Sequence, residues 1–171
     1  ADIADTEMTQ KFIDAGANLN NQDINGCTAL MRASHFRKTD IVQMLIKAGA
    51  DVNIEDENGN TALMCASHKG RITKMLIEAN ADVNIQNQHG DTALMMAIHY
   101  RKKHVVQMLI KAGADVNIED EDGMTALMIA SHKGHTRIVK MLIEANADVN
   151  IQDEDGMTAL MIASEEGHKE T

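Results

Sequence analysis

Four histidines of this chain recur at nearly equal intervals, with spacings of 33, 31 and 33 residues, at His35, His68, His99 and His132. Imidazole binds transition metals and titrates near neutral pH. Histidines on separate packed helices lie about 8–10 Å apart, which is too far to share one zinc ion at about 2.1 Å. We therefore predict no metal and no other cofactor. A pH-sensitive surface stays a hypothesis, and unchanged partner affinity between about pH 5.5 and 7.5 would contradict it.

Other residues that could do chemistry are sparse. The acidic run from Asp120 to Gly123 lacks the spaced ligands and terminal Glu of a calcium-binding loop, because Thr125 begins a helix. Cys27 and Cys65 fall at different places in the repeating pattern, so we expect two reduced thiols rather than a disulfide. No Ser, Cys or Asp nucleophile stands recognisably beside a base and oxyanion donors, so we predict that the protein is not an enzyme.

The histidines belong to a longer repeating pattern. The tetrapeptide Thr-Ala-Leu-Met begins at five positions, with spacings of 33, 31, 33 and 33 residues: Thr28, Thr61, Thr92, Thr125 and Thr158. A fixed period of about 33 residues indicates stacked supersecondary units, each too small to bury its apolar face alone. Function must then lie on the surface of the stack.

One unit can be followed along the chain. Gly123 suits a turn, and Thr125 is placed to cap a first helix with its hydroxyl. Gly134 should end that helix, and the apolar stretch 138–145 predicts a second helix covered on several sides. Each second helix is followed by a residue type that accepts the left-handed conformation: Gly16, Gly49 and Gly113, or Asn80 and Asn146.

The flanking sequence repeats too, since residues 44–54 return as 108–118, and residues 75–85 return as 141–151. With the tetrapeptides, this pattern resembles the ankyrin-repeat family over roughly residues 6–167. The resemblance implies an all-α ankyrin-repeat solenoid, with stacked helix-turn-helix units, β-hairpin-like finger loops and a concave face that binds proteins. It implies no catalysis. The usual Pro and His of the tetrapeptide are Ala and Met here, from which we expect looser first turns.

We predict a single domain over residues 1–171. Its parts are an N-terminal half-repeat at 1–22, repeats at 23–55, 56–86, 87–119 and 120–152, and a C-terminal half-repeat at 153–171. The repeat 56–86 is two residues short, and alignment places the gap between its helices, so its second helix should start late or tilt. Arg37 and Arg101 stand where other repeats have Gly, so those two turns must accept a side chain or reshape.

The resemblance also implies where a partner binds. Seven and eight residues after each Thr are the concave-face positions: His35, Phe36, His68, Lys69, His99, Tyr100, His132, Lys133, Glu165 and Glu166. The implied finger positions are Ile24, Asn25, Glu57, Asn58, Asn60, Gln88, His89, Asp91, Glu121, Asp122, Met124, Glu154, Asp155 and Met157. Phe36 and Tyr100 read as anchors of an interface, or as rings that pack on the neighbouring Arg37 and Arg101.

Charge narrows the class of partner. A net charge of −10 argues against nucleic acid. The fingers become more acidic towards the C-terminus, which is explained either by solubility alone or by attraction of a partner protein or peptide with a basic segment. No apolar run is long enough to suggest a membrane span, and we expect an intracellular, cytoplasmic protein. The main alternative is a structural or self-associating repeat segment, or a fragment of a larger multidomain protein, that stacks head-to-tail through its half-repeat ends.

Overall fold

The computed structural model describes residues 3–167, and every regular element among them is an α-helix. The predicted all-α class is confirmed. The chain divides into two compact units, one ending at Asp82 and one beginning at Val83. The first unit holds α1 (Ile3–Asp14), α2 (Ala29–His35), α3 (Thr39–Lys47), α4 (Ala62–Cys65) and α5 (Gly70–Glu78). The second holds α6 (Ala93–His99), α7 (Lys103–Lys111), α8 (Ala126–His132), α9 (Thr136–Glu144) and α10 (Ala159–Glu165).

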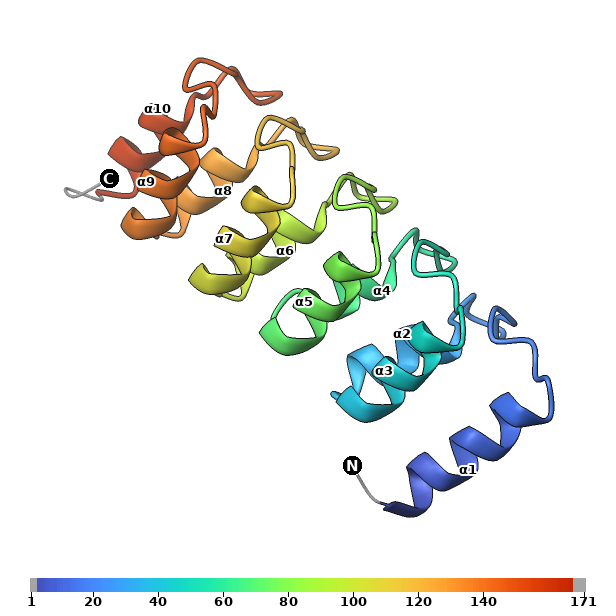
Figure 1. The fold of residues 1–171 in the computed structure, drawn as a ribbon. Coiled ribbons are helices and arrows are strands. Elements are labelled where there is room, and N and C mark those ends of the chain that lie inside the picture. The colour runs from blue at the N-terminus through green and yellow to red at the C-terminus, as the bar shows by residue number, and fades with distance from the viewer. Residues whose placement is uncertain (1–2, 168–171) are drawn as a thin grey trace. The chain divides into compact units, whose positions relative to one another are not determined.

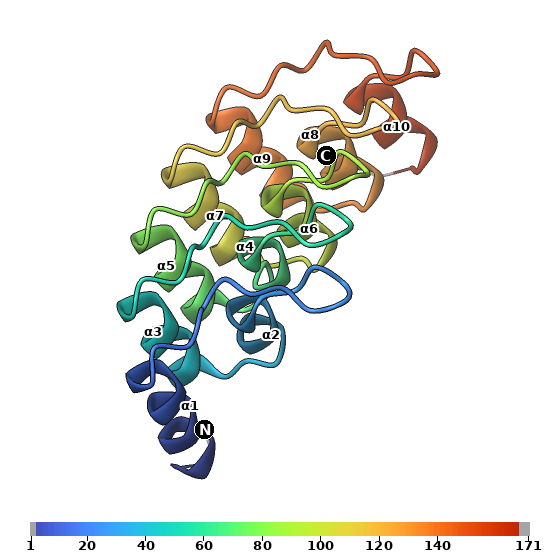
Figure 2. The same ribbon diagram turned by 90° about the vertical axis from the view of Figure 1, so that its right-hand side faces the viewer.

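Each unit is built from two rows of helices. In the first unit, α2 and α4 form one row, and α1, α3 and α5 form the other (Figure 1). The two rows meet through contacts of α2 with α3 and of α4 with α5. In the second unit, α6, α8 and α10 form one row, and α7 with α9 forms the other (Figures 1 and 2). The end of the predicted C-terminal half-repeat, residues 168–171, lies outside the described part of the chain. The prediction of a single domain stays a prediction.

Every first helix begins at the threonine of the tetrapeptide. The five threonine hydroxyls each accept a hydrogen bond from the methionine amide three residues later, at 3.3–3.4 Å. In two repeats the methionine sulfur also accepts from the threonine amide, with Thr28 N to Met31 Sδ and Thr125 N to Met128 Sδ both at 3.4 Å. The predicted cap is confirmed, and methionine sulfur supplies a reciprocal contact in place of a carboxylate.

The second helices end as the sequence indicates. Gly49 and Gly113 have φ of 87° and 91°, and Asn80 and Asn146 have φ of 61° and 64°, so both residue types occupy the left-handed region. Asparagine side chains then connect successive repeats within each unit. In each case the asparagine Oδ1 atom accepts a hydrogen bond from a backbone amide of the next repeat, at 2.8–2.9 Å. The acceptor and donor residues are Asn20 and Asp51, Asn53 and Asp82, Asn84 and Asp115, and Asn117 and Asp148.

The short repeat departs from our prediction for its second helix. Helix α5 has nine residues, as α9 does, and Met75 and Met141 are both the sixth residue of their helices. The prediction that α5 starts late was wrong. The first helix is shortened instead, since α4 has four residues where α8 has seven. The buried side chains of α5 fix its register, so the missing residues are lost from the end of α4 and its turn.

The fingers share one backbone pattern. In the fourth, the amide of Asp120 donates to the Met124 carbonyl, and the Asp120 carboxylate accepts from the amides of Asp122 and Met124 at 3.0 and 2.8 Å. Neighbouring fingers also bond, as where the Glu121 amide donates to the His89 carbonyl at 3.0 Å. An isolated antiparallel bridge between Glu119 and Thr125 closes this finger at its base.

Candidate functional site

In each unit, most of the predicted concave-face residues lie at the ends of the first helices, and we call these residues the helix-end row. Helices α2, α6, α8 and α10 end at His35, His99, His132 and Glu165, and their C-cap residues are Phe36, Tyr100, Lys133 and Glu166. The sequence spacing therefore places these eight residues at equivalent points of the fold.

In the first unit the row presents Phe36, whose exposed fraction is 62%. Its ring meets the His35 ring edge-on, with centroids 5.0 Å apart and planes at 86°. This is a favourable aromatic geometry, and it holds the ring in place without covering it. Arg37 follows with φ of 58°, so its turn keeps the glycine-like conformation with an arginine.

In the second unit the row mixes aromatic, basic and acidic groups. Tyr100 is 52% exposed. Partial burial lowers the pKa of His99, and Lys133 lowers it further, while Asp91 and Asp120 oppose this. The neutral form of His99 is therefore favoured relative to an ordinary histidine. His132 Nδ1 lies 3.1 Å from Glu166 Oε1, which links the ends of α8 and α10.

His68 and Lys69 do not occupy the equivalent positions. Because α4 ends at Cys65, His68 lies in the turn and Lys69 becomes the N-cap residue of α5. The Lys69 side chain is buried, and its ammonium donates to the Cys65 carbonyl at 2.6 Å. Burial lowers the pKa of Lys69. The shortened α4 therefore leaves Lys69 with little exposed surface, and its part in binding stays a prediction.

The predicted finger residues are mostly exposed, with Ile24 at 90%. His89 Nδ1 lies 2.9 Å from Glu121 Oε1, which joins two neighbouring finger tips. Asp91, Met124 and Met157 are only partly exposed. Burial raises the pKa of the Asp91 carboxyl. Met124 and Met157, singled out in the sequence as surface methionines, thus contribute part of their side chains to the interior.

An ion pair that the sequence did not reveal holds the first finger. Both Nε and one terminal nitrogen of Arg32 donate to Asp23 Oδ2, at 3.1 and 2.6 Å. The Arg32 hydrogen bond, with the amides of Asn25 and Cys27, lowers the pKa of Asp23. The two residues are nine apart in the chain, and only the fold of the finger onto α2 brings them together.

The two cysteines are free thiols, as predicted. Burial raises the pKa of Cys27, and it raises that of Cys65 to about 11. Both therefore stay protonated near neutral pH, which makes them poor nucleophiles and poor metal ligands. Within residues 3–167, no group of three His, Cys, Asp or Glu side chains is arranged to hold a metal ion.

The described helices include none with the length and apolar character that crossing a membrane requires. A comparison with curated proteins gives no match to this chain. The family model described as ankyrin repeats (3 copies) matches in four overlapping registers, at residues 1–87, 37–120, 68–153 and 94–171. These matches cover the chain, and they agree with the threonine-capped first helices, the longer second helices and the intervening fingers. The protein belongs to the ankyrin-repeat family.

Proposed function

We propose that this protein binds a partner protein or peptide through the helix-end row and the fingers. Ankyrin repeats are generally protein–protein interaction modules. The observation that carries the proposal is the exposure of Phe36 and Tyr100, because only three aromatic residues occur in the chain and two of them lie in the row. Exposed aromatic rings on ordered helix ends are the kind of residue that dominates the energy of interfaces.

Charge supports a basic segment as the bound element. Asp122, Glu154 and Asp155 lie exposed on the fingers of the second unit, and Glu165 and Glu166 extend the negative surface into the row. Such a surface attracts basic segments and speeds their encounter, with a dependence on salt concentration. The aromatic rings would then supply the apolar contacts that the charges cannot.

A pull-down from source-cell lysate tests this proposal with the triple variant Phe36→Ala, His99→Ala and Tyr100→Ala. We expect the partner to be lost, because removing one desolvated aromatic anchor costs about 2 kcal/mol. Phe12→Ala is the matched control for an exposed ring outside the row, since Phe12 is 60% exposed and lies on α1. It is used at a concentration at which the wild type is monomeric, because Phe12 also belongs to the exposed apolar face of α1. Circular dichroism must show that all variants fold. A partner that the triple variant retains, or that Phe12→Ala also loses, would contradict binding through the row.

Exposed apolar surface on α10 favours a second candidate, which is head-to-tail self-association. Leu160 and Met161 are 73% and 49% exposed, whereas Leu127 and Met128 at the same positions of α8 are 2% and 1% exposed. Beside them lies an apolar groove of about 240 Å³, lined also by Val139, Ile143 and Val149. Helix α8, by contrast, contacts both α9 and α10.

Helix α1 carries the complementary exposed face. Met8 and Phe12 are 59% and 60% exposed, and they correspond in sequence to Ile138 and Leu142 of α9, which are buried at 2% and 0%. We infer that α1 of one molecule can cover α10 of the next, as α9 covers α8. Light scattering should then show a mass that grows with concentration in the wild type and stays monomeric in Leu160→Lys. A monomeric mass for the wild type at high concentration would contradict self-association.

A further inference from the structure

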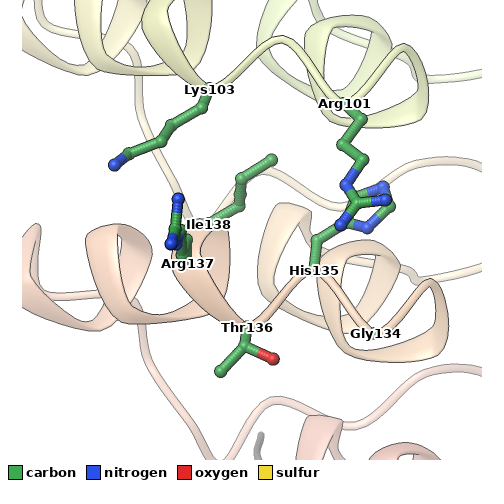
Figure 3. Close-up of a pocket in the computed structure, with 7 residues that line it drawn as sticks. All are labelled: Arg101, Lys103, Gly134, His135, Thr136, Arg137 and Ile138. Atoms are coloured by element: carbon green, nitrogen blue, oxygen red, sulfur yellow. The ribbon is translucent and has the colours of Figure 1, made fainter.

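A positively charged cavity lies in the second unit, away from the acidic fingers. It has a volume of about 610 Å³ and opens between the turn that precedes α7 and the start of α9. Arg101 and Lys103 line it from one repeat, and His135 and Arg137 line it from the next. Figure 3 shows the Lys103 and Arg137 side chains extending towards the same space, and the Arg101 guanidinium against the His135 ring.

The charge of this cavity is not compensated within the described part of the chain. Its lining contains three permanent cations, Arg101, Lys103 and Arg137, and no carboxylate. None of the three belongs to a salt bridge among the described residues. Burial lowers the pKa of His135, and Arg101 and Lys133 lower it further. Like charges gathered in one cavity of an acidic protein lower their free energy by binding an anion.

Arg101 occupies its place at a cost in backbone strain. Its φ is 52°, a value that glycine adopts without penalty and that a residue with a Cβ adopts with strain. The corresponding residues Gly134 and Gly167 have φ of 62° and 70°. This turn therefore carries glycine at Gly134 and Gly167, and arginine at Arg101 and Arg37. The strained φ of Arg101 favours a functional role for the arginine side chain, since glycine would adopt the same turn without strain.

The first unit holds a smaller version of the same arrangement. Arg37, with φ of 58°, and Arg71 line a cavity of about 290 Å³ at the start of α5. There the deletion brings His68 and Lys69 into the lining, and the Lys69 ammonium is already bonded to a carbonyl. The arrangement thus recurs at the same two turns that carry arginine, and the copy in the second unit is the larger one, with no cation among its lining residues already bonded to a carbonyl.

We propose that the cavity of Arg101, Lys103 and Arg137 is a binding site for a phosphate group. Arginine matches the oxygen geometry of phosphate with two parallel hydrogen bonds, and lysine adds a point charge. Helix α9 begins at the cavity without a side-chain cap hydrogen bond, so its first amides can add donors. A dianion matches three cations better than a single carboxylate does. The phosphate can belong to a small polyphosphate or to a phosphorylated side chain of another protein.

The site is tested by nuclear magnetic resonance on the full chain, with tripolyphosphate and a phosphoserine peptide as probes. The same peptide with unmodified serine is the control ligand. We expect saturable shifts of the amides of residues 135–138 with at least one phosphorylated probe, and at least about tenfold weaker binding in Arg137→Gln. The probe that binds more tightly distinguishes the two sources of phosphate. Shifts absent with both probes, or equal with the unmodified peptide, would overturn the proposal.

Two further variants test whether binding depends on the cavity rather than on the net charge of the protein, and whether Arg101 is needed for stability. Arg101→Gly removes the cation and relieves the strained turn, so we expect an unchanged or higher melting temperature together with at least about tenfold weaker binding. Lys111→Gln removes the same charge from an exposed position outside the cavity and should bind as the wild type does. A loss of stability in Arg101→Gly with binding intact would show a structural arginine and contradict the assigned role. If Lys111→Gln weakened phosphate binding as much as Arg101→Gly does, binding would depend on the overall charge of the surface and not on the cavity.

Discussion

Leu127→Ala is expected to lower the free energy of unfolding by about 2–5 kcal/mol, because it empties a fully packed position. Leu127 is 2% exposed and lies in α8 between neighbours from both helix rows. Leu160→Ala makes the same chemical change at the same repeat position of α10, where the side chain is 73% exposed. There we expect a loss of less than about 1 kcal/mol, since little apolar surface returns to water.

Urea denaturation followed by circular dichroism measures both variants, and the difference between them is the informative quantity. Each repeat contacts only its neighbours, so the unfolding transition should be checked for a second phase before one free energy is assigned. Similar losses in Leu127→Ala and Leu160→Ala would contradict the prediction. They would also mean that the α10 face is covered in solution, which is the outcome that head-to-tail association requires.

Gly90→Ala is expected to destabilise the protein by at least about 2 kcal/mol more than Gly113→Ala does, because only the first adds a steric clash to backbone strain. Both glycines have positive φ, of 74° and 91°. A Cβ on Gly90 would lie 2.6 Å from the Cα of Asp120 in the next finger, whereas a Cβ on Gly113 meets nothing within 4 Å. Gly113→Ala should therefore cost only the strain, about 1 kcal/mol.

Thermal and urea unfolding measure the stability of the two variants. The difference between them gives the contribution of contacts between neighbouring fingers, because both variants carry the strain of a positive φ. The backbone of Asp120 cannot move aside cheaply, because its amide and carboxylate hold the fourth finger in shape. Equal stabilities for Gly90→Ala and Gly113→Ala would show that neighbouring fingers separate in solution. The close approach of Gly90 to Asp120 would then contribute little to stability.

The repeated residues allowed the fold to be predicted at the level of elements. Thr125 and its four counterparts marked the starts of first helices, and Gly or Asn marked the ends of second helices, because capping and left-handed turns depend on local residue type. The deletion in the second repeat could not be placed in this way. Its position was decided by the buried face of α5, which keeps its register against α3 and leaves α4 to shorten.

The candidate site was predictable only in part. The exposure of Phe36 and Tyr100 followed from their place at helix ends, but the burial of Lys69 depended on the shortened α4. The cavity was missed because its residues come from two repeats. Arg101 was visible in the sequence as an arginine in place of glycine, yet the sequence did not show that it lines one cavity with Arg137 of the next repeat, which depends on how the repeats stack.

The methionine sulfurs of the threonine caps make the folded chain selective in how it is oxidised. Met31 and Met128 are 2% and 1% exposed, with their sulfurs held against the amides of Thr28 and Thr125, whereas Met161 is 49% exposed. A peroxide reaches a buried thioether only when its repeat opens, while an exposed one reacts in the native state. Sulfoxide at Met31 or Met128 therefore indicates that its repeat has opened at some time. Because a sulfoxide is too polar for the core, it also disfavours refolding of that repeat.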